Sequence, residues 1–159
     1  MNKKPEELIV EALRARGETL AIAESLTGGG VGVAISSVPG ASDVFVGGVT
    51  AYQLRIKEEI LKVPSPLISQ FGVVSEEVAV AMADGARDIF SSTWAISTTG
   101  VAGPGESEGV AAGTVWISIR GPINQSTQLQ IAGEREIVRN ATVSSAITAF
   151  ARILASLGS

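Results

Sequence analysis

The stretch that decides the fold runs from residue 19 to residue 35 and reads Thr-Leu-Ala-Ile-Ala-Glu-Ser-Leu-Thr-Gly-Gly-Gly-Val-Gly-Val-Ala-Ile. Its first five residues are mainly apolar, its middle is polar and rich in glycine, and its end is apolar again. This order predicts a strand, a turn and then a helix. In an open α/β sheet, the turn that leaves the carboxyl end of a strand lies where ligands bind. We therefore expect Ser25 to lie at a binding site.

The polar residues of this turn have two interpretations. The start of the following helix offers unpaired backbone N–H groups, which suit an oxyanion or a phosphate. Alternatively, Ser25 and Thr27 only cap the helix and the glycines only turn the chain, an arrangement that is common in proteins. The local pattern does not decide between the two.

The rest of the sequence continues this alternation of strands and helices. We predict helices over residues 5–16, 28–37, 53–61, 75–90 and 134–157, and strands over residues 19–23, 45–52, 93–99, 113–120 and 126–131. Residues 67–74 are expected to form a connector with at most one helical turn. The short link between the last two strands predicts an antiparallel hairpin. Together these elements predict one α/β domain over residues 1–159, a three-layer α/β/α sandwich with a mixed, mostly parallel sheet of about five strands.

Three of the predicted strands are followed by polar or glycine-rich loops. Ser25 follows the first strand, Tyr52 and Lys57 follow the second, and residues 100–105 follow the third. If these strands are parallel neighbours, the three loops meet at one edge of the sheet and form a cleft. The alternative for Lys57 is a solvated helix residue that pairs with an adjacent glutamate.

Composition excludes several classes of partner and location. The chain has 159 residues, a net charge of −4 and no basic tract, so we expect neither nucleic acid nor an anionic membrane as a partner. No apolar run reaches the roughly 18 residues of a membrane helix, and the first residues do not resemble a signal peptide. We therefore expect a cytoplasmic protein. The high content of apolar residues, with few aromatic ones, is compatible with a homodimer.

The absence of cysteine and histidine restricts the chemistry. Without them the chain offers no usual zinc site, no disulfide, no thiol nucleophile and no Ser-His-Asp triad. A P-loop, a nucleophile elbow and a dinucleotide fingerprint are also missing from the sequence. A covalent hydrolase of this composition needs lysine, a carboxylate or the N-terminal amine as its base. Two of the four lysines lie near the N-terminus, which leaves Lys57 and Lys62 as candidates.

Several segments, in order over nearly the whole chain, resemble the CinA C-terminal domain family. They are Ala23-Glu24-Ser25-Leu26-Thr27-Gly28-Gly29, Val38-Pro39-Gly40-Ala41-Ser42, Gly47-Gly48-Val49-Thr50-Ala51-Tyr52 with Lys57, Gly72-Val73-Val74-Ser75-Glu76-Glu77-Val78-Ala79, Thr99-Gly100-Val101-Ala102-Gly103-Pro104, Gly113-Thr114-Val115-Trp116-Ile117 and Gly133-Glu134-Arg135-Glu136-Ile137-Val138-Arg139. Enzymes of this family are nicotinamide-nucleotide amidases, which hydrolyse the carboxamide of nicotinamide mononucleotide (NMN) to nicotinic acid mononucleotide and ammonia. The resemblance implies this reaction, in pyridine nucleotide salvage, without a metal or an organic cofactor. It does not extend to the other domain of full-length CinA.

The resemblance also implies roles for individual residues. Ser25 would be the nucleophile, Lys57 its general base, and Tyr52 a residue that supports or relays the proton. The pKa of Lys57 would have to fall well below its ordinary value, as desolvation in a closed cleft allows. The expected binding residues are Thr27, Gly28 and Gly29 for the oxyanion, Thr99, Gly100 and Gly103 for the nucleotide pocket, and Arg139 and Arg135 for the phosphate.

The chain departs from the family pattern at two places. Many relatives have Tyr-Ser-Asn-x-x-Lys where this sequence has Gln53-Leu54-Arg55-Ile56 between Tyr52 and Lys57, and Ala111-Ala112 replaces the usual Lys-Pro. These changes remove small polar groups beside the expected base and a basic residue from the rim. Two other functions therefore stay open: a catalytically silent nucleotide-binding or regulatory domain, and an amidase for another small amide.

Overall fold

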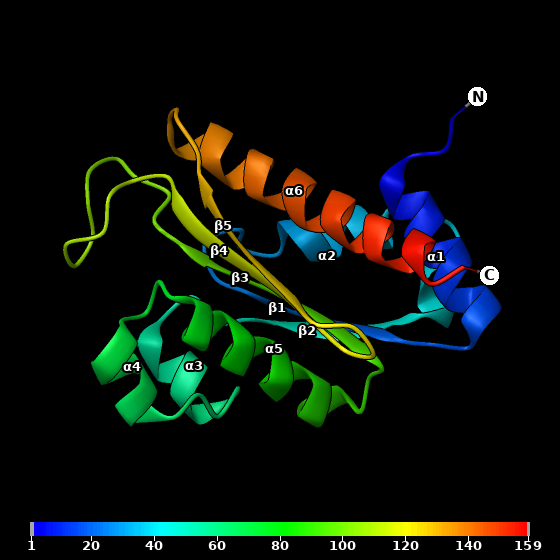
Figure 1. The fold of residues 1–159 in the computed structure, drawn as a ribbon, viewed down its shortest axis with the longest axis horizontal. Helices are drawn as coiled ribbons and strands as arrows, with labels where there is room; N and C mark the ends of the chain where they lie inside the picture. Colours follow the sequence, from blue (N-terminus) through cyan, green and yellow to red (C-terminus); the bar gives the residue numbers. More distant parts are fainter. Residues whose placement is uncertain (1, 159) are drawn as a thin grey trace.

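The computed structural model describes residues 2–158 and arranges them as a five-stranded sheet between two layers of helices (Figure 1). The upper layer in Figure 1 consists of α1 (Pro5–Arg16), α2 (Gly30–Ser36) and α6 (Arg135–Ser156). The lower layer consists of α3 (Leu54–Glu59), α4 (Ser65–Phe71) and α5 (Glu76–Phe90). A short 3-10 helix, Ala41–Asp43, precedes the second strand. The predicted three-layer α/β/α architecture is confirmed.

The sheet is mixed, and four of its strands run in one direction. The strands are β1 (Leu20–Glu24), β2 (Phe45–Thr50), β3 (Trp94–Gly100), β4 (Thr114–Arg120) and β5 (Gln125–Gln130), in the order β2-β1-β3-β4-β5. β1 is parallel to β2 and β3, whereas β4 is antiparallel to β3 and β5. The predicted antiparallel hairpin is thus present as β4 and β5.

The position of β1 explains why the loops after three strands meet. β1 lies between β2 and β3, and all five of its residues are buried. Because the three strands are parallel, their carboxyl ends lie at the same edge of the sheet. The turn after β1, the segment from β2 to α3 and the loop after β3 therefore share one end of the domain.

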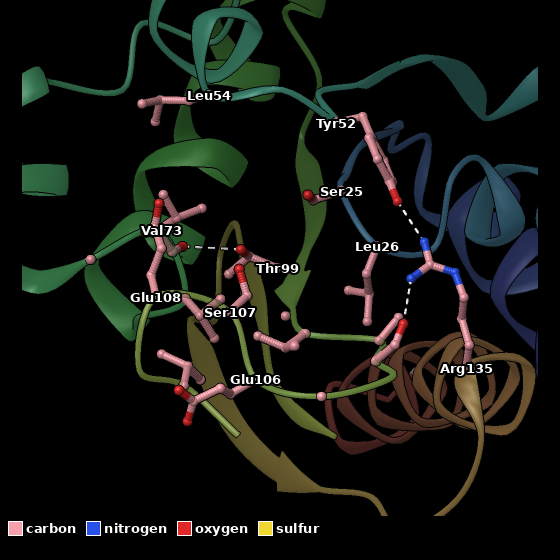
Figure 2. Close-up of a pocket in the computed structure, with 18 of the residues that line it drawn as sticks. Ser25, Leu26, Tyr52, Leu54, Val73, Thr99, Glu106, Ser107, Glu108 and Arg135 are labelled. Carbon is pink, nitrogen blue, oxygen red and sulfur yellow. Dashed lines mark hydrogen bonds between the residues drawn. The ribbon is translucent and has the colours of Figure 1, made fainter. Parts of the chain in front are cut away.

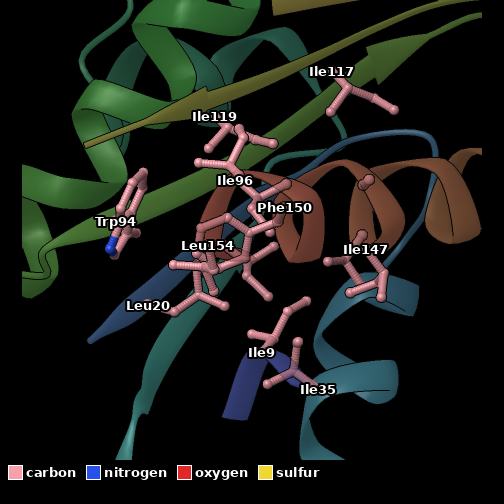
Figure 3. Close-up of a cluster of buried hydrophobic side chains, with 14 of the residues drawn as sticks. Ile9, Leu20, Ile35, Trp94, Ile96, Ile117, Ile119, Ile147, Phe150 and Leu154 are labelled. Atoms are coloured by element: carbon pink, nitrogen blue, oxygen red, sulfur yellow. The ribbon is translucent and has the colours of Figure 1, made fainter. Parts of the chain in front are cut away.

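The two faces of β1 differ in the size of their side chains. Leu20 and Ile22 belong to a large cluster that also contains side chains of α1, α2 and α6 (Figure 3). In this cluster the rings of Trp94 and Phe150 pack edge to face, with their centroids 5.3 Å apart. Ala21 and Ala23 belong to the smaller cluster beneath the sheet, with α5 side chains. Small residues let a helix backbone approach the sheet closely, and burial of both clusters supplies the main favourable term in folding.

One predicted element is wrong. Residues 67–74 were expected to be a connector, but α4 occupies Ser65–Phe71. The sequence has prolines at positions 64 and 66, and proline is unfavourable in the interior of a helix. Pro66 lies in the first turn of α4, where its missing N–H has no helical partner to lose and its fixed φ suits the helix. None of the helices within residues 2–158 combines the length and the hydropathy needed to span a bilayer.

Replacement of Gly85 tests how closely α5 packs. A Cβ atom at Gly85 would collide with the backbone carbonyl of Leu61, and backbone cannot move as a flexible side chain can. Alanine favours a helix by about 1 kcal/mol over glycine, yet we expect Gly85→Ala to lower the free energy of unfolding by about 1–3 kcal/mol because the site becomes overpacked. Urea unfolding measures this change.

A matched control is available in another helix. A Cβ atom at Gly32 in α2 would meet its nearest neighbours at 3.6 Å, an ordinary contact distance. Gly32→Ala should therefore be neutral or slightly stabilising. Equal destabilisation by both substitutions would contradict the packing explanation.

Candidate active site

A cavity of about 380 Å³ lies at the carboxyl edge of β1, β2 and β3 (Figure 2). Its walls come from the turn after β1, the segment from Tyr52 to Lys57, the segment that precedes α5, the loop after β3 and the first residue of α6. The cleft predicted from the three loops is therefore present. Figure 2 shows Ser25 on one wall, with Tyr52 and Arg135 to one side and Glu106 and Glu108 toward the other.

Ser25 and Lys57 are in direct contact. The Nζ atom of Lys57 lies 3.0 Å from the Oγ atom of Ser25. Both residues are buried: Lys57 is 1% exposed and Ser25 is 7% exposed. The amine also donates to the backbone carbonyls of Ala51, at 2.7 Å, and Tyr52, at 3.4 Å. The alternative of a solvated Lys57 is wrong, and Glu59 instead pairs with Arg55.

The environment of Lys57 favours its neutral form. Burial lowers the pKa of Lys57 from the ordinary 10.5 to about 8, because removal from water destabilises the ammonium more than the amine. Its hydrogen-bond partners are a hydroxyl and two carbonyls, none of them a carboxylate. A neutral amine can keep both carbonyl bonds and accept the proton of the Ser25 hydroxyl, as a general base requires.

The turn that carries Ser25 is fixed by contacts with β3 and α6. The N–H of Ser25 donates to the carbonyl of Thr98 at 3.1 Å, and the hydroxyls of Thr27 and Thr98 are 2.8 Å apart. From α6, Arg139 donates its Nε–H to the carbonyl of Leu26 at 3.0 Å. Because these partners belong to two regular elements, Ser25 has little freedom to move.

Glu24 is a structural residue that the sequence interpretation missed. Its side chain is buried, and the two carboxylate oxygens accept the N–H groups of Val31, at 2.8 Å, and Gly32, at 3.1 Å. The carboxylate thus occupies the positive end of α2, and these two amides are not free for a ligand. A charged residue at the end of an otherwise apolar buried strand was the signal for such a role.

The three residues expected at the oxyanion, Thr27, Gly28 and Gly29, have different surroundings in the structure. Thr27 is buried against Thr98, Gly28 donates its N–H to the carbonyl of Ser25 at 3.0 Å, and Gly29 precedes α2 with φ 103°. The cavity wall contains Leu26 and none of these three. Within residues 2–158 the N–H of Leu26 has no hydrogen-bond acceptor, which leaves it available to a ligand.

Arg135 bridges the mouth of the cavity. Its guanidinium donates to the hydroxyl of Tyr52 at 2.6 Å and to the carbonyl of Gly103 at 2.7 Å (Figure 2). The Tyr52 side chain is 55% exposed, and its hydroxyl points to Arg135, whereas only its backbone carbonyl contacts Lys57. The structure therefore does not bring the Tyr52 hydroxyl to the serine–lysine pair.

The remaining expected binding residues divide between two places. Thr99, Gly100 and Gly103 line the cavity, and the Thr99 hydroxyl donates to the carbonyl of Val73 at 3.0 Å. Arg139 lines a second depression, which also contains Thr27 and shares Arg135 with the cavity. The sequence interpretation also missed six residues of the cavity wall. Val73 and Val74 lie in the segment before α5, and the loop after β3 contributes Glu106, Ser107, Glu108 and Val110.

Substitution of Glu24 tests the fixing of the turn. Glutamine at this position keeps one acceptor but turns an NH₂ group toward a backbone N–H. We expect Glu24→Gln to lower the free energy of unfolding by about 1–3 kcal/mol, the cost of a buried donor without an acceptor. Urea unfolding compares this variant with Glu11→Gln, which breaks the exposed pair with Lys3 and should cost less than about 1 kcal/mol. Similar values for the two variants would show that the carboxylate does not hold α2.

The fold and the site together define an α/β protein with a buried serine–lysine pair at the carboxyl edge of its sheet. The sequence model of the protein family described as the CinA C-terminal domain matches residues 2–154 of this chain. The chain belongs to the CinA C-terminal domain family, as its sequence motifs indicated.

Individual relatives agree with this assignment. A CinA-like protein of Acaryochloris marina is 44% identical over 153 residues, which cover 94% of this chain and 36% of the relative. A CinA-like protein of Synechococcus sp. is 51% identical over 116 residues, which cover 72% of this chain and 28% of the relative. This chain therefore spans about a third of the length of these curated relatives.

Solved structures share the fold over almost their full length. A competence or damage-inducible protein from Enterobacter asburiae has a TM-score of 0.91 at 27% identity and covers 96% of this chain and 99% of its own. A CinA superfamily protein from Klebsiella pneumoniae has a TM-score of 0.90 at 29% identity and covers 97% of this chain and 99% of its own.

Proposed function

We propose that the chain is a nicotinamide-nucleotide amidase that hydrolyses the carboxamide of NMN to nicotinic acid mononucleotide and ammonia. The observation that carries the proposal is the 3.0 Å contact between the Ser25 Oγ and the Lys57 Nζ at the wall of a cavity. A buried amine with a pKa near 8 is able to activate a serine hydroxyl. Membership of the CinA C-terminal domain family supports the choice of substrate.

In the first half of the reaction, the Ser25 oxygen attacks the carboxamide carbon while its proton passes to the neutral amine of Lys57. The negative charge that develops on the carboxamide oxygen needs backbone donors, and in this proposal the N–H of Leu26, a residue of the cavity wall, is one of them. The Lys57 ammonium then donates its proton to the amide nitrogen. The C–N bond breaks, ammonia leaves, and an ester on Ser25 remains.

In the second half, water attacks the ester carbon and gives a proton to Lys57. The bond from carbon to the Ser25 oxygen breaks, and Lys57 returns the proton to that oxygen. The product leaves as a carboxylate. Lys57 thus acts twice as base and twice as acid, and its pKa close to neutrality serves both directions of proton transfer.

The charges around the cavity suggest how the nucleotide would lie. Arg135 is the exposed cation at its mouth, and Lys57 is buried with Ser25, so the phosphate would bind at Arg135 and the carboxamide at Ser25. The carboxylates of Glu106 and Glu108 line the opposite side and would repel the phosphate there. Arg139 holds the carbonyl of Leu26 and in this proposal positions the turn instead of the phosphate.

The direct test measures ammonia release from NMN by the purified protein and by Ser25→Ala. The proposal expects turnover by the natural sequence and none by the variant. Calorimetry that detects NMN binding without any turnover would identify a catalytically silent domain instead. Turnover of other small carboxamides, but not of NMN, would keep the serine–lysine chemistry and change the substrate.

The pH dependence of the reaction tests the role of Lys57. Lys57 acts as base only when neutral, and its pKa is about 8. We therefore expect kcat/KM to rise almost tenfold per pH unit below pH 8 and to level off above it, as the neutral fraction does. Initial rates between about pH 6.5 and 9 show this, with Ser25→Ala as the blank. A profile that falls over this range would exclude a neutral lysine as the base.

A further inference from the structure

Arg135 stands between two depressions of the surface. It is the first residue of α6, and it lines both the cavity that contains Ser25 and the second depression, which Arg139 also lines. Arg135 is exposed, so packing alone does not direct its side chain to one of the two. A guanidinium that is to bind a ligand in the cavity therefore needs contacts that hold it there.

The second depression offers two carboxylates to Arg135. Glu134 and Glu136 line it, and both are neighbours of Arg135 in the sequence. A carboxylate and a guanidinium attract each other and form strong hydrogen bonds. Yet none of the ion pairs formed within residues 2–158 includes Arg135. The guanidinium has its partners on the cavity side instead.

Two hydrogen bonds fix the guanidinium at the mouth of the cavity. One nitrogen donates to the hydroxyl of Tyr52 at 2.6 Å, and another donates to the carbonyl of Gly103 at 2.7 Å (Figure 2). Bonds from two nitrogens set the plane of this rigid, fork-shaped group. A guanidinium has five N–H groups, so three of them remain for the oxygens of a phosphate.

The hydroxyl of Tyr52 is the side-chain group that supports Arg135. Tyr52 follows β2, and its side chain is exposed, so the ring adds little packing against Arg135. Within residues 2–158, Arg135 is the hydrogen-bond partner of this hydroxyl. Removal of the hydroxyl alone would leave Arg135 with the Gly103 bond and free to turn toward the carboxylates of the second depression.

We propose that Tyr52 is a positioning residue whose hydroxyl holds the guanidinium of Arg135 in the cavity for the phosphate of the substrate. The inference rests on the proposed function for the identity of the ligand. It gives Tyr52 a role in selecting phosphorylated carboxamides, which differs from the support of proton transfer that the family resemblance implies.

The first test is Tyr52→Phe, which removes the hydroxyl and keeps the ring. We expect KM for NMN to rise about tenfold, as the loss of a hydrogen bond to a charged group predicts, while kcat changes less than twofold and the pH profile keeps its shape. Nicotinamide riboside, which is NMN without the phosphate, should be hydrolysed equally by the variant and the natural sequence. A large fall in kcat, or an equal loss with both substrates, overturns the proposal.

The second test combines substitutions at the two residues. If Tyr52 acts through Arg135, Tyr52→Phe should raise KM no further once Arg135→Ala is present. Arg55→Ala is the matched control, because Arg55 is an exposed arginine of α3 that pairs with Glu59 and lies outside the cavity wall. It should leave KM unchanged. Additive losses from Tyr52→Phe and Arg135→Ala overturn the proposal.

Binding without turnover separates this inference from the proposed function. In the Ser25→Ala background, calorimetry should show about tenfold weaker NMN binding when Tyr52→Phe is added. If the natural sequence releases no ammonia from NMN, the proposed function fails, and weaker binding in this background still supports the role of Tyr52. Equal affinity with and without the Tyr52 hydroxyl, or no NMN binding at all, overturns it.

Discussion

Lys57→Met is expected to lower kcat for ammonia release by about 10³-fold, the usual contribution of a positioned general base. Methionine has nearly the length of lysine and fits a buried position, but it can neither take the proton of Ser25 nor return it to the leaving amine. The variant leaves the carbonyls of Ala51 and Tyr52 without the donor that they have now. Steady-state kinetics with NMN measures the loss, and circular dichroism confirms that the variant is folded.

Lys62→Met is the control for this experiment. Lys62 is the other lysine that the sequence left as a candidate base, and the structure places it on the surface, outside the cavity wall. Its substitution should change kcat less than twofold. Full activity of Lys57→Met would exclude Lys57 as the base, and an equal loss in both variants would point to a general effect of charge.

The proximity of Ser25 and Lys57 was predictable because it depends on topology. A run of apolar residues, a glycine-rich turn and a helix recur along the sequence, and parallel neighbouring strands bring the ends of β1, β2 and β3 to one edge. The absence of histidine and cysteine had already reduced the possible bases to a few groups. The sequence therefore predicted the fold, and the contact between Ser25 and Lys57 follows from that fold. Their roles as nucleophile and base stay a prediction.

The directions of individual side chains were not predictable in the same way. Tyr52 and Arg139 stand in the expected segments, yet the Tyr52 hydroxyl contacts Arg135 and Arg139 contacts Leu26. Such contacts join segments that are far apart in the sequence, so local pattern cannot determine them. Glu24 shows the same limit, because its carboxylate turns back to α2 only when the glycine-rich turn has been formed.

The stability of the protein is expected to rise with pH in a way that depends on Lys57. The folded-state pKa of Lys57 is about 8, below the ordinary 10.5 of an exposed lysine. Below pH 8 both the folded and the unfolded chain bind the proton, and the full cost of a buried ammonium opposes folding. Between pH 8 and 10.5 only the unfolded chain binds it, so the free energy of unfolding increases with pH. At 1.36 kcal/mol per pH unit the total increase is about 3 kcal/mol.

Lys57→Met isolates this increase from the titration of other groups. Urea unfolding of both proteins from about pH 7 to pH 10.5 gives the difference between their free energies of unfolding, and this difference should shift by about 3 kcal/mol in favour of the natural sequence. A difference that stays constant would mean that Lys57 keeps its proton in the folded state throughout this range. The amine would then be unable to accept the proton of Ser25 near neutral pH, and the proposed mechanism would lose its base.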